Sequence, residues 1–200
     1  VRLLSFFIAV FVPSLYVAAT TFHQEMIPGT LLLSLSAQRE GVPLPAFGEV
    51  LLMEFVFEII REAGIRMPRV AGQALSIIGA IVLGQAAVDA GLITAAIVIV
   101  VSVTGIANFV VPAYSFGIAQ RMLRFTFIIL AGFMGLFGIL CGTLLLIAHL
   151  ASLKSFGVPY LSPMAPSYPA DWRDVLVRVP RPQMGARAPL FVRNLKKKRR

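Results

Sequence analysis

The sequence has little charge and almost no cysteine. Charged side chains make up 14% of its 200 residues, whereas soluble domains carry about 25%. The single cysteine, Cys141, lies in an apolar run, which excludes a disulfide framework and a cage of thiolate metal ligands. Apolar side chains reach 58%, and a disordered chain has the opposite composition. The composition therefore predicts a polytopic membrane protein.

Recognisable catalytic and nucleotide-binding motifs are also missing. No HExxH, GxSxG, P-loop or GxGxxG pattern occurs in the context that each requires. The two histidines, His23 and His149, have no convergent set of ligands around them in the sequence, and no Glu-x-x-His motif of the di-iron type is present. Asp89 is alone near the end of an apolar segment, whereas an intramembrane enzyme needs paired groups. We therefore expect no catalytic residues, no metal and no cofactor.

The positive charge is confined to the last part of the chain. Residues 1–153 contain seven basic and seven acidic side chains, whereas residues 154–200 contain eleven basic and two acidic ones. A basic segment that follows a hydrophobic one is expected in the cytoplasm, facing anionic lipid headgroups. No aromatic–basic module accompanies it, so nucleic acid is not an expected partner. The pattern predicts a transmembrane domain at 1–153 and a basic, proline-rich cytoplasmic tail at 154–200.

Four apolar segments approach the roughly 20 residues that a membrane helix needs. They cover residues 3–22, 70–88, 92–116 and 125–150. Four crossings would place both ends of the chain on one side of the membrane. Arg121 and Arg124 conflict with this count, because they fall in a loop on the other side, although short basic loops favour the cytoplasm. The sequence predicts an all-α membrane bundle of about four spans.

A further helix is expected over residues 46–63, where Glu54, Glu58 and Glu62 recur every four residues. Three carboxylates in the middle of a span cost roughly 9 kcal/mol, more than the roughly 5 kcal/mol that its apolar side chains contribute. The segment is therefore not expected to insert unaided. We expect an amphipathic helix at the membrane interface, or one that is held by the rest of the protein.

The three glutamates of this helix have two interpretations. They could form an acidic vestibule that concentrates cations. Alternatively, they form a solvated or ion-paired face, in which Arg61 and Arg66 are placed to bind Glu58 and Glu62.

Small or weakly polar side chains recur on one narrow face of the span at 70–88. This face consists of Gln73, Ser76, Ala80, Gly84 and Ala87. It could line a water-filled path, and these residues are our candidates for the lining of a pore. It could equally be a seam where helices pack closely, since small residues favour such contacts as well.

The last two spans carry two more features. Pro112 cannot donate a hydrogen bond to the carbonyl of Asn108, so a kink is expected there, which suits either a gate or a static bend. A ridge of small residues on the last span is expected to pack against another helix. It consists of Gly132, Gly135, Gly138 and Gly142.

Three segments resemble the membrane domain of GerA-type spore germination proteins, the A-subunit and its close paralogues. They are FHQEMIPGTLLLSLSAQREGVPLPAFGEVLLMEFVFEIIREAGIRMPR, GQALSIIGAIVLGQAAVDAG and FGVPYLSPMAP. The resemblance covers roughly residues 10–185. It implies a receptor in the inner membrane of the dormant endospore, in which A-subunits assemble with B-type and C-type subunits into a nutrient-gated ion channel.

The resemblance also implies a role for this chain within the receptor. Nutrient recognition is generally placed on the B-type subunit, so this chain would form a homo-oligomer that conducts monovalent cations through the small-residue face. Two other functions remain open: a non-conducting scaffold subunit and a secondary transporter of small solutes or ions. Family members carry a soluble domain ahead of the membrane part, whereas the first apolar segment here starts almost at once. The sequence is therefore expected to be a fragment or a truncated member.

Overall fold

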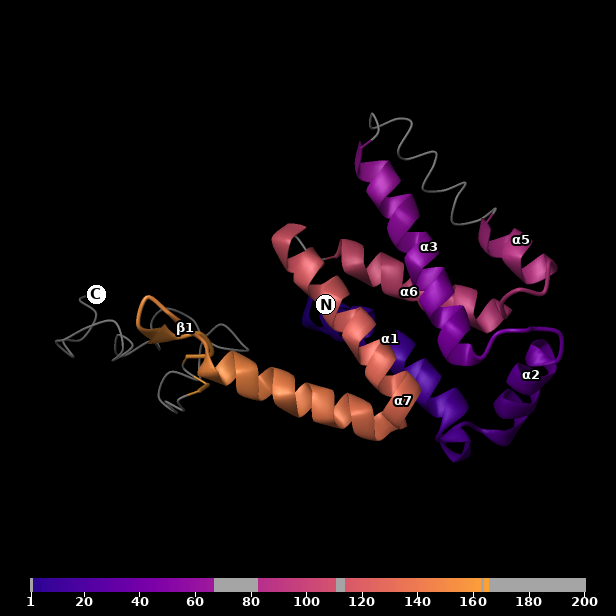
Figure 1. Cartoon of the computed structure of the whole chain (residues 1–200), viewed down its shortest axis with the longest axis horizontal. Coiled ribbons are helices and arrows are strands. Elements are labelled where there is room, and N and C mark those ends of the chain that lie inside the picture. Colours follow the sequence, from indigo (N-terminus) through magenta and orange to yellow (C-terminus); the bar gives the residue numbers. More distant parts are fainter. Residues whose placement is uncertain (1, 67–82, 111–113, 163, 166–200) are drawn as a thin grey trace, which may run out of the picture. The chain divides into compact units, whose positions relative to one another are not determined.

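The computed structural model describes residues 2–66, 83–110, 114–162 and 164–165. The chain divides into two units, Val1–Gly142 and Thr143–Arg200, and each is described by itself. Most of the described residues are helical (Figure 1), which confirms the expected helical class.

The described residues of the first unit form helices of widely different length. They are α1 (Arg2–Thr21), η1 (Gln24–Met26), α2 (Gly29–Arg39), α3 (Ala46–Arg66), α5 (Gly84–Asp89), α6 (Ala95–Phe109) and the first part of α7 (Tyr114–Ser152). Helix α1 contacts both α3 and α6, and α6 also contacts α3. Aromatic pairs join α1 to α7, with ring centroids 4.8 Å apart for Phe11 and Phe127 and 5.5 Å apart for Phe6 and Phe116.

The core of the first unit combines small side chains on α1 with branched ones on α6. Small side chains allow helix backbones to approach closely, which is how helices associate in a membrane. Aromatic rings lie directly over glycines as well, Phe57 over Gly105 and Phe47 over Gly132. The buried apolar residues at the centre are Ala9, Val10, Val17, Ala18, Val50, Ile93, Ile97, Val101, Phe127, Ile128 and Ala131.

Two of the described helices are long and apolar enough to cross a membrane, α1 and the Phe116–Ser152 part of α7. A shorter apolar stretch, Ala95–Asn108, lies in α6. Helix α3 does not meet these criteria, as its three central glutamates lead one to expect. Most of the predicted span at 70–88 lies outside the described residues, and so the count of four crossings stays a prediction.

The expected helix over residues 92–116 is wrong in its extent. Helix α6 ends at Phe109, and the following helix, α7, already begins at Tyr114. A proline disfavours helical backbone at the residue before it, and Pro112 lies between the two helices in the sequence. The apolar run is long enough for one span, but the described helices end and begin again within it, at Phe109 and Tyr114.

Helix α7 begins eleven residues before the predicted span at 125–150. Arg121 and Arg124 are consequently part of a helix and not of a loop between two spans. The rule that basic residues favour the cytoplasm applies to loops. The expected loop between two spans is therefore not present at Arg121 and Arg124, and the topology itself stays a prediction.

Helix α7 is broken at Gly135, whose backbone angles are φ 60° and ψ −141°. A straight helix would separate residues 127 and 142 by about 22 Å. Instead, a Cβ atom added to Gly142 would touch Phe127 and Leu130, and one added to Gly138 would touch the carbonyl of Leu130. Gly138 and Gly142 thus lie against the preceding part of their own helix, whereas a Cβ atom added to Gly132 would touch Phe47 of α3. Packing of the whole ridge against another helix stays a prediction.

We expect the substitution Gly135→Ala to lower the free energy of unfolding by about 1–3 kcal/mol, because residues with a Cβ atom avoid this backbone conformation. The added Cβ would also lie 3.0 Å from Phe22. Equilibrium unfolding in mixed detergent micelles measures the change. Gly117→Ala is the matched control, because a Cβ at Gly117 meets no atom within 4 Å and alanine favours a helix by up to about 1 kcal/mol. Equal effects of the two variants would contradict the role of Gly135.

Candidate functional site

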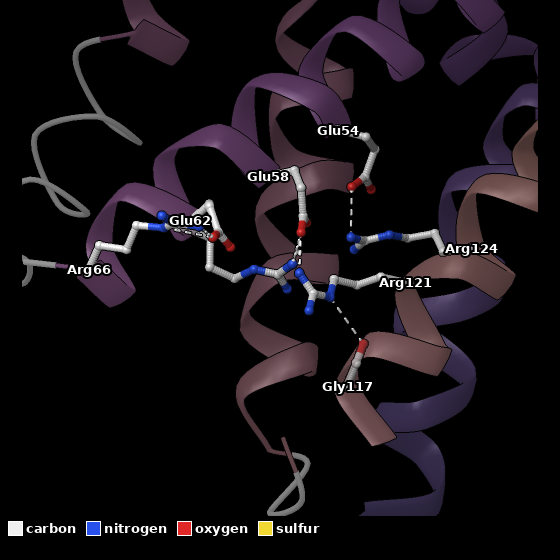
Figure 2. A network of polar contacts seen from close by, with 8 residues as sticks. Glu54, Glu58, Glu62, Arg66, Gly117, Arg121 and Arg124 are labelled. Atoms are coloured by element: carbon white, nitrogen blue, oxygen red, sulfur yellow. Dashed lines mark hydrogen bonds and ion pairs between the residues drawn. The ribbon is translucent and has the colours of Figure 1, made fainter. Parts of the chain in front are cut away.

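The most strongly charged part of the described structure lies between α3 and the first part of α7. Glu54, Glu58 and Glu62 are four residues apart on α3, so they lie on one side of that helix, one turn above another. Figure 2 shows that all three carboxylates point towards arginine side chains. The partners come from α3 itself and from α7, a helix that follows it more than 45 residues later in the chain.

Glu54 and Arg124 form the buried end of this network. Arg124 Nη2 lies 3.1 Å from Glu54 Oε2, and the two side chains are 1% and 0% exposed. A charge that leaves water needs a partner, because the desolvation penalty is several kcal/mol for each ion. Burial raises the pKa of Glu54 to about 7, while the attraction of the Arg124 guanidinium acts in the opposite direction. Each member of this pair therefore makes the burial of the other tolerable.

Glu58 has two arginine partners. Arg61, three residues later on α3, and Arg121 of α7 both donate to its carboxylate, and all three side chains are partly buried. Arg121 Nε also donates to the carbonyl of Gly117 at 3.2 Å, which holds its side chain along α7. Glu58 therefore links α3 to α7 one turn away from the buried Glu54 pair.

Glu62 and Arg66 form the exposed end of the network. Arg66 donates to Glu62 Oε1 from Nε at 2.9 Å and from Nη2 at 2.7 Å. The Arg66 side chain is 78% exposed, so this pair contributes at most about 1 kcal/mol. The expected pairing of Arg61 with Glu58 and of Arg66 with Glu62 is confirmed by these contacts.

Within the network, four arginines face three carboxylates, a sum of +1. Each carboxylate already has a positive partner within the chain. A free acidic surface that attracts cations would need unpaired carboxylates. These contacts support the ion-paired face, and the acidic vestibule stays a prediction.

A second buried carboxylate was not anticipated from the sequence. Glu49, in the first turn of α3, is fully buried, and its Oε2 accepts a hydrogen bond of 2.9 Å from the backbone N–H of Thr94. Thr94 is the N-cap of α6, and its own side chain makes no capping bond. The other oxygen, Oε1, lies 3.5 Å from Arg39 Nη2 in α2. Glu49 thus satisfies the N–H of the N-cap residue and places a negative charge at the positive end of α6.

The comparisons with known proteins agree with the resemblance noted in the sequence. The model of the Bacillus/Clostridium GerA spore germination protein family matches residues 1–190. The chain belongs to the GerA family. Spore germination protein KA of Bacillus subtilis (strain 168) is 55% identical over 90% of this chain, and GerLA of Bacillus cereus is 44% identical over 90%. An uncharacterised membrane protein of Bacillus subtilis (strain 168), YfkQ, is 47% identical over 90%.

This GerA-family chain corresponds to about a third of the length of these relatives, from 33% of protein KA to 37% of GerLA. No solved structure matches it significantly. The activity, ligands and partners of a whole germination protein therefore do not follow for this chain from the match alone. Family membership itself confirms the resemblance that the three sequence segments carried.

The candidate pore face of this GerA-family chain is only partly described. Gln73, Ser76 and Ala80 lie outside the described residues. Gly84 is buried at the start of α5, and a Cβ atom added to it would lie 3.3 Å from Cγ1 of Val98 in α6. Ala87, one turn later, is half-buried. Within one chain, the end of this face thus lies close to α6.

The candidate gate residues are not brought together with the charged network by any described contact. Asn108 lies in the last turn of α6 and is half-buried, and Pro112 lies outside the described residues. In the part of the chain that the structure describes, no three His, Cys, Asp or Glu side chains are grouped as metal ligands. The kink and the gate stay predictions.

Proposed function

We propose that this chain is the membrane-embedded part of a spore germination receptor subunit that forms, by oligomerisation, a nutrient-gated ion channel. The observation that carries the proposal is membership of the GerA family across residues 1–190. The two helices that are long and apolar enough to cross a membrane support the membrane location. By the family resemblance, that membrane is the inner membrane of the endospore. The excess of basic residues after the last apolar segment places the tail in the cytoplasm in this proposal.

In this proposal the face of Gln73, Ser76, Ala80, Gly84 and Ala87 meets copies of itself around water. The charged network supports the assignment indirectly, because its described arginines and glutamates bind each other and leave uncharged side chains to line a path. Small side chains keep such a path open, and a ring of apolar side chains around it allows closure by loss of water. Monovalent cations would be the permeant ions.

Gating would come from other subunits. The family resemblance places nutrient recognition on a B-type subunit, and it places a C-type subunit in the same receptor. A nutrient that binds the open assembly more tightly than the closed one shifts the equilibrium towards opening. Surrounding lipids complete the set of partners that we propose.

We expect Ala80→Leu, placed in an intact receptor, to lower the release of monovalent cations from spores after nutrient addition. A bulky side chain that adds about 1.4 kcal/mol to the barrier for ion passage slows it tenfold. Val82→Leu is the matched control, because helical periodicity predicts that residue 82 falls on another side of the same segment. Ion-selective electrodes on spore suspensions measure the rates.

Three outcomes separate the pore from the other functions. Equal rates for Ala80→Leu, Val82→Leu and the unmodified receptor would contradict a pore lined by this face. Flux that saturates with one solute would indicate a secondary transporter. If the purified subunits produce no conductance in planar bilayers, although they assemble, the chain is a scaffold.

A further inference from the structure

A β-hairpin follows α7 in the second unit of the chain. Its strands are β1 (Lys154–Ser155) and β2 (Val158–Pro159), which pair in an antiparallel register with Ser155 opposite Val158. The backbone N–H of Tyr160 donates to the carbonyl of Leu153 at 2.9 Å and closes the hairpin at its base. Figure 1 shows the hairpin at the C-terminal end of α7.

The tip of this hairpin is chemically unusual. Phe156 and Gly157 are the two turn residues, with φ angles of 49° and 80°. A two-residue turn with positive φ at both positions favours Asn-Gly or Asp-Gly, because a short polar side chain tolerates the left-handed conformation. Phenylalanine is a poor choice for that backbone. The local preference of the turn therefore does not explain why an aromatic side chain stands there.

Phe156 buries almost none of its surface against the described residues. Its side chain has a relative exposure of 106%, the highest of the large apolar side chains in the described residues. Tyr160, at the base of the hairpin, is exposed as well. A strained backbone that presents a fully exposed ring leads us to look for a partner of this ring beyond the described residues.

The sequence of exposed side chains along α7 locates the hairpin relative to a membrane. The large exposed side chains are all apolar as far as Ile147, and exposed polar or charged ones follow at His149, Ser152 and Lys154. The boundary between acyl chains and headgroups therefore falls near the end of α7. A strand advances about 3.4 Å per residue, so the tip lies within about 10 Å of Lys154.

We propose that the tip of this hairpin inserts Phe156 into the interfacial region of an anionic lipid bilayer. The headgroup region adds about 5–8 Å on each side of the hydrocarbon core, a depth that the tip can reach from the end of α7. The exposed ammonium group of Lys154 attracts lipid phosphates, and the phenol of Tyr160 suits the same layer. This charge complementarity favours lipid over a protein as the partner of the tip.

A tryptophan at position 156 tests this contact directly. The chain has one tryptophan, Trp172, so Trp172→Phe gives a background without tryptophan fluorescence. In that background, Phe156→Trp is reconstituted in vesicles of phosphatidylcholine and phosphatidylglycerol. We expect the tryptophan at position 156 to emit at a shorter wavelength than free tryptophan in buffer. We also expect lipids that are brominated close to the headgroup to quench it strongly. Leu145→Trp, on the exposed apolar side of α7, is the matched control and should be quenched by lipids brominated deep in the acyl chains.

The substitution Phe156→Asn distinguishes the contribution of the aromatic ring from that of the turn conformation. Asparagine favours this turn, so the hairpin is kept while the proposed anchor is lost. With Tyr160→Trp as the reporter, we expect Phe156→Asn to reduce quenching by the headgroup-labelled lipids. Phe156→Tyr should retain it.

Two outcomes would overturn the proposal. In the first, tryptophan at position 156 stays at long wavelength and is quenched only by aqueous iodide, while tryptophan at position 145 is quenched by lipid. In the second, the tryptophan at position 156 becomes shielded from iodide only when other receptor subunits are added, which indicates a protein partner. The position 145 reporter shows independently that α7 lies in the bilayer, and the test does not depend on whether the chain conducts ions.

Discussion

Replacing Arg124 with methionine is expected to lower the free energy of unfolding by about 3–5 kcal/mol, because it leaves the carboxylate of Glu54 buried without its partner. Both side chains are at most 1% exposed and lie 3.1 Å apart. Methionine keeps much of the volume and flexibility of arginine, so the loss measures charge compensation more than packing. Equilibrium unfolding in mixed detergent micelles gives the difference from the unmodified chain.

Two further variants make this experiment decisive. Arg66→Met removes the partner of an exposed glutamate, so we expect a change within about 1 kcal/mol. The double variant Glu54→Leu/Arg124→Met removes both buried charges, and it should recover most or all of the lost stability, as paired apolar replacements of buried ion pairs often do. If Arg124→Met costs no more than Arg66→Met, the buried pair does not hold α3 against α7.

Replacing Glu49 with alanine is expected to cost about 2–4 kcal/mol. The variant removes a charged acceptor from the N–H of Thr94, and hydrogen bonds to charged groups contribute about 1.5–3 kcal/mol. It also removes a negative charge from the N-terminus of α6 and leaves a space in the core. Because Glu49 also lies 3.5 Å from Arg39, the link from α3 to α2 is lost in the same step.

Hydrogen exchange distinguishes this cap from a general loss of packing. In Glu49→Ala we expect the amides at the start of α6 to exchange faster, while those in the middle of α1 keep their protection. Glu49→Gln retains an acceptor for Thr94, so its cost should be nearer 1 kcal/mol. Glu62→Ala is the exposed control on the same helix. Uniformly faster exchange over all helices in Glu49→Ala would contradict a specific capping role.

The charged network shows where prediction from the sequence succeeds and where it stops. The pairs Glu58–Arg61 and Glu62–Arg66 are three and four residues apart on one helix, a distance at which side chains meet whatever the rest of the chain does. Arg121 and Arg124 are 63 and 70 residues away from Glu58 and Glu54. Their pairing depends on how α3 and α7 pack, and the sequence suggested only that they were unusual basic residues in an apolar region.

The helix boundaries likewise include some that local sequence predicts and some that depend on the folded chain. Apolar length predicted α1 and most of the last helix correctly, because a membrane-spanning helix needs about 20 apolar residues in any fold. The break at Gly135 was missed, since a glycine inside a helical pattern is compatible with a continuous helix and its φ of 60° arises only in the folded chain. The capping role of Glu49 was missed because Thr94 is 45 residues away.

The amino-acid sequence by itself determined that this is a helical protein of the GerA family, with a stripe of glutamates on one helix and a basic tail. These properties follow from composition, local periodicity and characteristic segments, all of which exist before the chain folds. Only the tertiary structure decided that Glu54 and Glu58 are bound by arginines of α7, that Glu49 binds the N-terminus of α6, and that Phe156 stands exposed at a strained turn. Each of these depends on distances between residues that are remote in the chain, or on a backbone angle, and neither is encoded in a local pattern.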